Sequence, residues 1–455
     1  MKVKEILKVT KGKMLFGNEE LEVENFSKDT RTIQKGDIYI GIKGEKFDGS
    51  NFWNQALDAG ATAVIISNIQ ISKEEKEKYK DKTIIQVEDT FEALYEIAKY
   101  KRSLYNIPVI AVTGSVGKTS TKDIIASVVS QKYKALKTEG NNNNNIGLPL
   151  TILKLKDHEA LVVEMGMNHF GEISLLTNIA KPTLAVITNI GTSHIGNLGS
   201  RENILKAKLE ILEGMKIPRV IINNDNDLLH KWYEENKEKI EIHTYGINNS
   251  SDVIAEKIEL GEEKSKFVVK TSSEKVNIDV PVGGEHFVYN ALCGFMVGKV
   301  LGLTAKEIQN GISKFELTKK RMDIRVLKNG ATLINDSYNA SYESMKASLK
   351  YLSSRTDFRK IAVLGDMLEL GDFSKELHEK VGEEVANDNI DVLIWRGEFA
   401  KNIISKANKN KKTQCILLQN NEEILSKLQE ILKEGDGVLI KASNGMKFYE
   451  ICQKL

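Results

Sequence analysis

The sequence predicts an α/β protein with three domains: a small N-terminal α/β domain, a central domain built on a parallel sheet, and a C-terminal doubly wound, Rossmann-like domain. The chain has 455 residues, whereas one hydrophobic core usually serves about 100 to 200 residues. In two separate stretches, short aliphatic runs alternate with longer amphipathic segments, which is typical of strand-helix units in parallel sheets. We expect the domains to span 1–105, 106–316 and 317–455.

The first domain shows the weaker pattern. Its strand candidates are GDIYIGI (36–42), ATAVIIS (61–67) and TIIQVED (83–89), and a helix is expected over 91–105. In the central domain, IPVIAVTG (107–114), ALVVEMG (160–166), TLAVITNIG (183–191) and RVIINND (219–225) are strand candidates, and 120–133 is helical in pattern. KFVVKT and VNIDVPV, within 252–282, break this rhythm and predict an antiparallel appendage.

The C-terminal domain restarts the alternation. Five strand candidates are ATLINDSY (331–338), KIAVLGD (360–366), DVLIWRG (391–397), QCILLQ (414–419) and GVLIKAS (437–443). Between the first two, Met345, Leu349 and Leu352 recur at helical spacing. The region lacks a GxGxxG turn, so nothing in it favours a dinucleotide cofactor.

Composition narrows the possible partners and location. The 65 basic and 63 acidic side chains nearly cancel, so no broad electrostatic surface for nucleic acid is expected. Three separated cysteines, Cys293, Cys415 and Cys452, predict free thiols rather than disulfides or a metal cluster. No apolar run approaches the ~18 residues of a membrane span. We therefore expect a cytoplasmic protein without membrane insertion.

The strongest local signal is a glycine-rich hexamer directly after a strand and before a helix. Backbone N–H groups in such a turn point at anionic oxygens, a lysine adds a positive charge, and a following hydroxyl can hold Mg²⁺. The loop has two residues between its glycines instead of the usual four. We expect a P-loop-type ATPase domain that binds ATP through Gly114, Ser115, Val116, Gly117, Lys118, Thr119 and Ser120.

Polar residues follow the next two aliphatic runs. Glu164 ends the first, and Asn189, Thr192, Ser193 and His194 follow the second. Ligands gather at the carboxyl edge of a parallel sheet, and Mg²⁺ prefers oxygen ligands. By themselves, Glu164 could equally be a solvated strand end and His194 a structural histidine. By themselves, residues 206–210 likewise indicate an exposed helical face, and the asparagine tract 141–145 indicates a polar loop.

In order along the chain, these segments resemble the Mur ligase family of amide-bond-forming enzymes, whose short GxxGKT loop matches the hexamer. The resemblance covers nearly the whole chain. It rests on residues 26–49, TEGNNNNNIGLP, EMGMNHFGEI, TNIGTSHIGNLGS, KAKLEI, NNDND, GGEHFVYNAL, NDSYNAS and LGDMLELG.

The resemblance implies roles for individual residues. Lys118 and Thr119 would handle the ATP phosphates and a first Mg²⁺, with Glu164 as a metal ligand and His194 near a second Mg²⁺. Lys208 would be a carbamylated lysine, with Lys118, Lys208 and His194 forming the catalytic set. Further nucleotide contacts would come from Asn290, Arg321, Asp336, Tyr338 and Asn339. Substrate contacts would come from Thr30, Arg31, Asp48, Gly49, Asn142, Asn144, Thr192 and Ser193.

Within the family, NDSYNAS and LGDMLELG look most like the branch that uses D-alanyl-D-alanine. The implied reaction is ATP-dependent addition of this dipeptide to UDP-N-acetylmuramoyl-tripeptide through an acyl phosphate. A monomer is expected by default for a chain of three packed domains. Another family ligase, adding a diamino acid or extending folate with glutamate, is the nearest alternative, and a non-ligase P-loop ATPase is a further one. Phe287, Ser341-Tyr342 and Ala442 depart from the family's pattern, although none is a phosphate or metal position.

Overall fold

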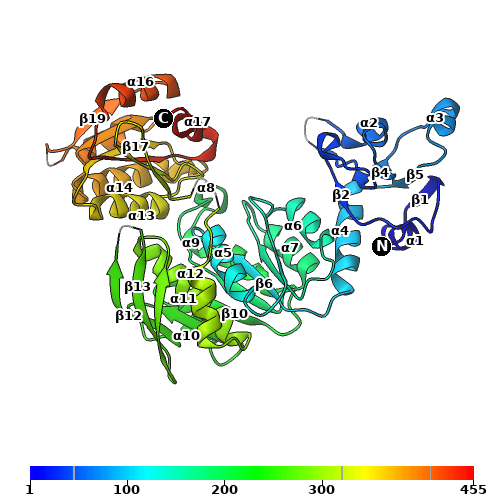
Figure 1. Ribbon diagram of the computed structural model, residues 1–455, viewed down its shortest axis with the longest axis horizontal. Helices are drawn as coiled ribbons and strands as arrows, with labels where there is room; N and C mark the ends of the chain where they lie inside the picture. The colour runs from blue at the N-terminus through cyan, green and yellow to red at the C-terminus, as the bar shows by residue number, and fades with distance from the viewer. Residues whose placement is uncertain (45–46, 262, 319–320, 410) are drawn as a thin grey trace.

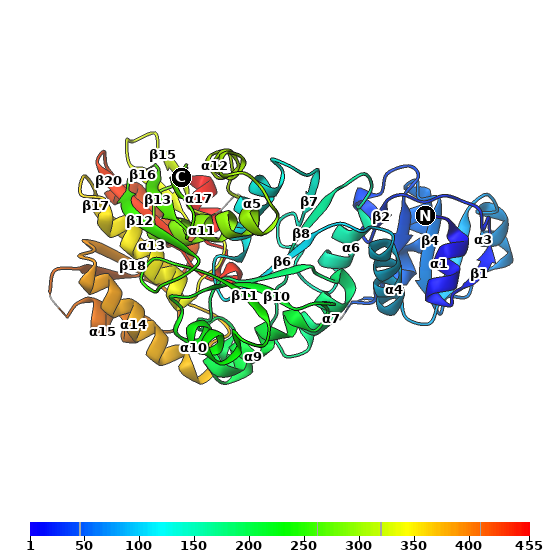
Figure 2. The same ribbon diagram turned by 90° about the horizontal axis from the view of Figure 1, so that it is seen from below.

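The computed structural model describes residues 1–44, 47–261, 263–318, 321–409 and 411–455, and it confirms the α/β class. Three separate sheets occur in chain order. The N-terminal lobe lies at one end of an elongated molecule, whereas the central and C-terminal lobes lie side by side (Figures 1 and 2). Among the described residues, we find no helix with the length and apolar character that crossing a membrane requires.

The N-terminal lobe has a five-stranded sheet in the order β1-β5-β4-β3-β2, parallel except for β1. Helix α4 contacts α1 of this lobe and also α6 and α7 of the central lobe. Buried Arg102 on α4 donates to the carbonyl oxygens of Ala180 at 2.8 Å and Tyr105 at 2.6 Å, which fixes this joint. The elements are α1 (Val3–Thr10), β1 (Lys13–Phe16), β2 (Phe26–Ser27), β3 (Ile38–Ile40), α2 (Trp53–Asp58), β4 (Ala63–Ser67), α3 (Lys73–Lys78), β5 (Thr83–Val87) and α4 (Thr90–Ser103), with 3-10 turns η1 (Thr30–Thr32) and η2 (Gly49–Phe52).

The central lobe has a nine-stranded sheet in the order β14-β13-β12-β11-β10-β9-β6-β8-β7. Strands β6 to β12 run parallel, and β13 and β14 are antiparallel additions, as the change of rhythm predicted. The elements are β6 (Val109–Thr113), α5 (Lys118–Val129), β7 (Ala135–Lys137), α6 (Gly147–Leu153), β8 (Ala160–Glu164), α7 (Glu172–Ala180), β9 (Leu184–Ile187), α8 (Ile195–Leu198), α9 (Arg201–Leu209), η3 (Glu210–Leu212), β10 (Arg219–Asn223), α10 (Asp227–Asn236), β11 (Glu241–Gly246), β12 (Val253–Leu260), β13 (Ser265–Lys270), β14 (Lys275–Val280), α11 (Glu285–Val300) and α12 (Ala305–Ser313).

The C-terminal lobe has a six-stranded sheet in the order β15-β16-β20-β17-β18-β19, parallel except for the edge strand β15. The five predicted strands are present, and Met345, Leu349 and Leu352 are fully buried on α13. The elements are β15 (Asp323–Val326), β16 (Thr332–Asn335), α13 (Tyr342–Ser354), β17 (Arg359–Gly365), η4 (Gly371–Phe373), α14 (Ser374–Asn387), β18 (Val392–Arg396), α15 (Ala400–Ala407), β19 (Gln414–Leu417), α16 (Asn421–Ile431), β20 (Asp436–Lys441), η5 (Asn444–Met446) and α17 (Tyr449–Lys454).

Six strands were not anticipated: β1, β2, β7, β11, β12 and β15. All six have partly or fully exposed residues, and β15 is exposed along its whole length. Such strands lack the continuous aliphatic run that marks a buried parallel strand. All three cysteines are free, as predicted; Cys293 and Cys452 are buried and Cys415 is partly buried.

Candidate functional site

A cavity between the central and C-terminal lobes, here called the interlobe cavity, has a volume of about 430 Å³. Strands β6, β8 and β9 direct their carboxyl ends toward it, and the start of α13 and the end of β20 line its other side. Predicted residues that line it are Ser115, Val116, Gly117, Lys118, Ser120, Asn144, Glu164, Ser193, His194, Asn290, Arg321, Asp336, Tyr338 and Asn339. Thr119, Thr192 and Lys208 do not line the cavity but interact with residues that do. Thr119 accepts a hydrogen bond from Arg321, and Thr192 donates one to Glu343. The charge of Lys118 acts on Lys208.

The turn from β6 into α5 has the conformation that a phosphate cradle requires. Gly114 (φ +153°) and Gly117 (φ +79°) adopt backbone angles that side chains disfavour. A Cβ on Gly114 would lie 1.9 Å from the Thr188 hydroxyl oxygen, so the turn packs directly on the end of β9. Lys118 begins α5 and donates to the Gly114 carbonyl at 2.8 Å. The helix N-terminus and Lys118 therefore face the cavity together.

The same turn is tied to the residues after β9. Val116 N–H donates to the Asn189 side-chain oxygen at 3.0 Å, and the Val116 carbonyl accepts from the Thr188 hydroxyl at 2.7 Å. Ser115 N–H donates to the Asn189 carbonyl. These bonds fix the turn before any ligand arrives, which lowers the ordering cost of binding.

Glu164, beside this turn, has one side-chain oxygen without a hydrogen-bond partner among the described residues. It is the last residue of β8 and is 2 % exposed. Its Oε1 accepts from the Asn143 amide at 2.7 Å, while Oε2 is buried without a hydrogen-bond partner among the described residues. A buried carboxylate oxygen left unpaired is costly unless a cation or donor meets it. This vacant lone pair fits a hard divalent cation such as Mg²⁺.

Lys208 is a buried amine on α9 and is 2 % exposed. Burial and the neighbouring Lys118 charge hold the pKa of Lys208 well below its ordinary value. Burial also lowers the pKa of Lys118, although Glu164 acts against that shift. A lowered pKa favours the neutral amine, which is the nucleophilic form of lysine.

Arg321 joins the two lobes over the P-loop. Its Nη2 donates to the Thr119 hydroxyl at 3.2 Å, and its guanidinium lies 4.1 Å from the centre of the Tyr338 ring. Its Nε is buried and unpartnered among the described residues. Asn290 accepts from the Thr121 hydroxyl at 3.0 Å and lies beside Gly117. The Thr119 oxygen that we predicted to face Mg²⁺ thus contacts Arg321 in this structure.

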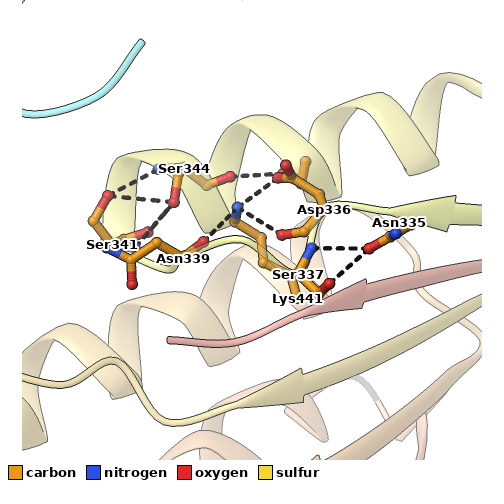
Figure 3. A network of polar contacts seen from close by, with 8 residues as sticks. Asn335, Asp336, Ser337, Asn339, Ser341, Ser344 and Lys441 are labelled. Carbon is orange, nitrogen blue, oxygen red and sulfur yellow. Dashed lines mark hydrogen bonds and ion pairs between the residues drawn. The ribbon is translucent and has the colours of Figure 1, made fainter. Parts of the chain in front are cut away.

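The C-terminal side of the cavity is built on a buried ion pair (Figure 3). Lys441, the last residue of β20, lies 2.5 Å from Asp336 Oδ2 and 3.0 Å from the Asn339 carbonyl oxygen. Ser348 also donates to Asp336 at 2.7 Å. Burial acts to raise the pKa of Asp336, but Lys441 and Ser348 hold it below its ordinary value. Asp336 is therefore an ionised, internally paired group, and its partner Lys441 was not identified from the sequence.

The loop after β9 contacts the C-terminal lobe through two predicted residues. Thr192 donates to Glu343 through its backbone N–H and its hydroxyl. His194 Nδ1 lies 2.6 Å from Glu369 Oε2. Both glutamates were absent from the predicted site, because each reads as an ordinary exposed helix or loop acid.

The asparagine tract is a loop before α6, as its composition predicted. Asn144 accepts from the backbone N–H groups of Ile146 and Gly147, so its side-chain oxygen caps the turn. Asn142 does not line the cavity, and Asn143, which we had not selected, contacts Glu164. Five identical residues give no sequence signal for which one contacts Glu164.

The predicted uridine-nucleotide residues lie in the N-terminal lobe and do not line the interlobe cavity. Thr30 and Arg31 belong to η1, and Asp48 caps η2, which starts at Gly49. The Tyr39 hydroxyl donates to the Gly49 carbonyl at 2.8 Å. Burial, with Asp29 and Asp48 nearby, raises the pKa of Tyr39 to about 12. Residues 45–46, within the stretch 26–49, lie outside the described residues.

The three departures from the expected pattern have structural roles. Phe287 is buried with its ring 4.3 Å from that of His286. Ser341 caps α13, and the Tyr342 hydroxyl donates to Glu384 at 2.8 Å. Ala442 is fully buried. None of these contacts involves the P-loop or Glu164.

Family models match three consecutive parts of the chain. Residues 22–102 match the model "Mur ligase family, catalytic domain", residues 112–298 the "Mur ligase middle domain", and residues 320–444 the "Mur ligase, glutamate ligase domain".

Individual relatives match over the full length. The chain is 37% identical to a UDP-N-acetylmuramoyl-tripeptide--D-alanyl-D-alanine ligase of Bacillus subtilis, over 100% of this chain and 98% of that protein. A crystal structure of MurF from Acinetobacter baumannii superposes with a TM-score of 0.89 at 29% identity, covering 100% and 98%. A MurF ligase from Thermotoga maritima in complex with ADP superposes with a TM-score of 0.82 at 29% identity, covering 96% and 98%.

The Asp336–Lys441 pair generates a stability prediction. Lys441→Met leaves a buried carboxylate without its cation, which is expected to cost about 3–5 kcal/mol of unfolding free energy at pH 7. Because the folded-state pKa of Asp336 lies below its unfolded value, its stabilising contribution is present above about pH 4 and is lost as pH falls. In the variant, protonation removes the unpaired charge, so its deficit against wild type should shrink toward low pH.

Urea unfolding of both proteins between pH 7 and pH 4 measures this deficit. Lys380→Met is the control, because Lys380 forms an exposed helix pair with Glu376 in the same lobe and should cost under about 1 kcal/mol. Equal losses in the two variants would contradict the assigned role of Lys441.

Proposed function

Because this chain belongs to the Mur ligase family, it is an ATP-dependent amide ligase, and we propose that it adds D-alanyl-D-alanine to UDP-N-acetylmuramoyl-tripeptide in peptidoglycan synthesis. The observation that carries the proposal is the meeting of a P-loop and the unpartnered Glu164 oxygen at one cavity. Full-length similarity to D-alanyl-D-alanine ligases supports the choice of amine.

Each domain has a part in this proposal. The range 1–105 binds the uridine nucleotide, using Thr30, Arg31, Asp48 and Gly49 around Tyr39. The range 106–316 binds ATP, and the range 317–455 binds the amine and covers the nucleotide. The enzyme acts as a cytoplasmic monomer, and a reducing compartment agrees with its three free thiols.

Two Mg²⁺ ions are part of the proposal. Glu164 Oε2 and the Thr119 hydroxyl would be oxygen ligands for the first, and His194 would serve the region of the second. Bound Mg²⁺ supplies charge neutralisation on the phosphate oxygens. For Thr119 to serve, Arg321 must move from its hydroxyl, and a phosphate oxygen is a suitable new partner for that guanidinium.

The chemistry proceeds in two displacements. An oxygen of the tripeptide carboxylate attacks the γ-phosphorus of ATP, and the bond to the β-phosphate oxygen breaks to leave ADP and an acyl phosphate. The dipeptide amine then attacks the acyl carbon, loses a proton, and inorganic phosphate leaves. The Lys118 side chain and the N–H groups of Gly117 and Lys118 stabilise the negative charge on the transferring group. The paired Asp336 and Lys441 hold the loop that covers this site.

Carbamylation of Lys208 is also part of the proposal, because it would place a negative charge near Lys118. A neutral amine attacks CO₂ and releases one proton, giving an anionic carbamate. Burial and Lys118 favour the neutral amine, and a carbamate would offset the positive charge of Lys118. The resulting oxygens would supply the anionic ligand that the present neighbours of Lys208 do not.

Substrate choice is tested by phosphate release from ATP in the presence of UDP-N-acetylmuramoyl-tripeptide and a panel of amines. We expect D-alanyl-D-alanine to stimulate release, while glutamate, lysine and diaminopimelate leave it near background. Stimulation by a diamino acid or by glutamate on a folate would instead identify another branch of the family. Release that needs no acceptor carboxylate would indicate a P-loop ATPase without ligase activity.

The carbamate predicts a specific chemical signature. Lys208→Ala should be nearly inactive and partly rescued by small carboxylates, because these can replace the missing anion. Wild-type protein in ¹³C-bicarbonate should give a carbamate resonance that disappears in the variant. Lys206→Ala is the control, since Lys206 is exposed on the same helix. Full activity of unrescued Lys208→Ala, or an unchanged carbamate signal, would refute the assignment.

A further inference from the structure

The loop from Gly191 to Gly196, here called the β9 loop, links the P-loop to the C-terminal lobe. On the P-loop side, Gly191 N–H donates to the Ser115 hydroxyl at 2.9 Å, and the Ser193 hydroxyl donates to the Ser115 carbonyl at 3.2 Å. The position of the β9 loop therefore sets the position of Ser115.

On the other side, two carboxylates of the C-terminal lobe hold the β9 loop. Glu343, in the first turn of α13, accepts from Thr192 N–H at 2.8 Å and from the Thr192 hydroxyl at 3.2 Å. Glu369 contacts His194 through its side chain and accepts from Gly196 N–H through its carbonyl at 3.2 Å. Both lobes thus meet through directional bonds rather than through apolar contact alone.

Glycines and left-handed backbone conformations allow the β9 loop and the C-terminal lobe to approach each other closely. A Cβ on Gly191 would lie 2.5 Å from the Glu343 carboxyl carbon, and a Cβ on Gly196 would lie 2.5 Å from Gly371 N. His194 (φ +63°) and Glu369 (φ +64°) both adopt left-handed conformations that non-glycine residues disfavour. Strain of this kind persists only where surrounding contacts over-determine it.

Glu343 lines the cavity, yet a carboxylate is a poor ligand for phosphates. Its two oxygens are both occupied by Thr192, and its place in the first turn of α13 suits a negative charge. These features favour a role in holding the β9 loop over a role in binding substrate.

We propose that Glu343 and Glu369 are positioning residues: by clamping the β9 loop they fix the P-loop turn in register with the C-terminal lobe. This inference rests on the proposed function, because it assigns the clamp to assembly of the ligase site. Nucleotide binding by the central lobe alone does not need the clamp, whereas transfer chemistry, which uses groups from both lobes, does.

Steady-state kinetics of Glu343→Ala, Glu343→Gln and Glu369→Ala test the clamp. Misplacing reacting groups can cost about 10²-fold in rate, so we expect kcat to fall about 10- to 100-fold in both alanine variants, with the KM for the uridine nucleotide changed less than about threefold. Glu343→Gln should recover most of kcat, because an amide can still accept from Thr192 N–H. Glu376→Ala, an exposed acid of the same lobe, should match wild type.

Small-angle scattering of the same proteins gives a readout that does not depend on the amine. Glu343→Ala should be more extended than wild type with an unchanged thermal midpoint, and Glu343→Gln should match wild type. Wild-type kcat in Glu343→Ala, or alanine and glutamine variants that are equally impaired, would overturn the clamp. Wild-type protein that ligates none of the amines would instead refute the proposed function, and a scattering difference would then still be measurable.

Discussion

Close packing between the turn after β6 and the turn after β9 organises the site. Gly114 approaches Thr188 so closely that any side chain there would overlap the hydroxyl. Strands β6 and β9 are neighbours in the parallel sheet, so both turns leave the same edge. The phosphate-binding turn is thus supported by the sheet, and the β9 loop carries that support to the C-terminal lobe.

Charge is the second constraint. Lys118, Lys208 and Arg321 converge near the P-loop, while Glu164 is the acid that the structure leaves partly unpaired beside them. Basic side chains gathered at one place repel one another in the protein alone but suit a triphosphate and its metal. On the opposite wall, by contrast, Asp336 and Lys441 already neutralise each other. Lys441 also contacts the Asn339 carbonyl, so the pair holds the loop 336–341 that lines the cavity.

The sequence predicted the sheets well, because buried parallel strands carry continuous aliphatic runs. It also located the P-loop and Glu164, since strand ends in one sheet share an edge. It did not predict β1, β2, β7, β11, β12 and β15, whose exposed residues dilute the apolar signal. Asn143, Lys441, Glu343 and Glu369 were missed because their roles depend on contacts between distant segments. Domain boundaries and the roles of individual site residues stay predictions.

A crystal structure with a non-hydrolysable ATP analogue and Mg²⁺ tests the central claim most directly, namely that the turn 114–119 holds the triphosphate beside Glu164. The account predicts phosphate oxygens on the N–H groups of Gly117 and Lys118 and a metal ion bound to Glu164 Oε2. Nucleotide bound elsewhere, or an empty turn with Glu164 still unpaired at saturating analogue, would contradict it.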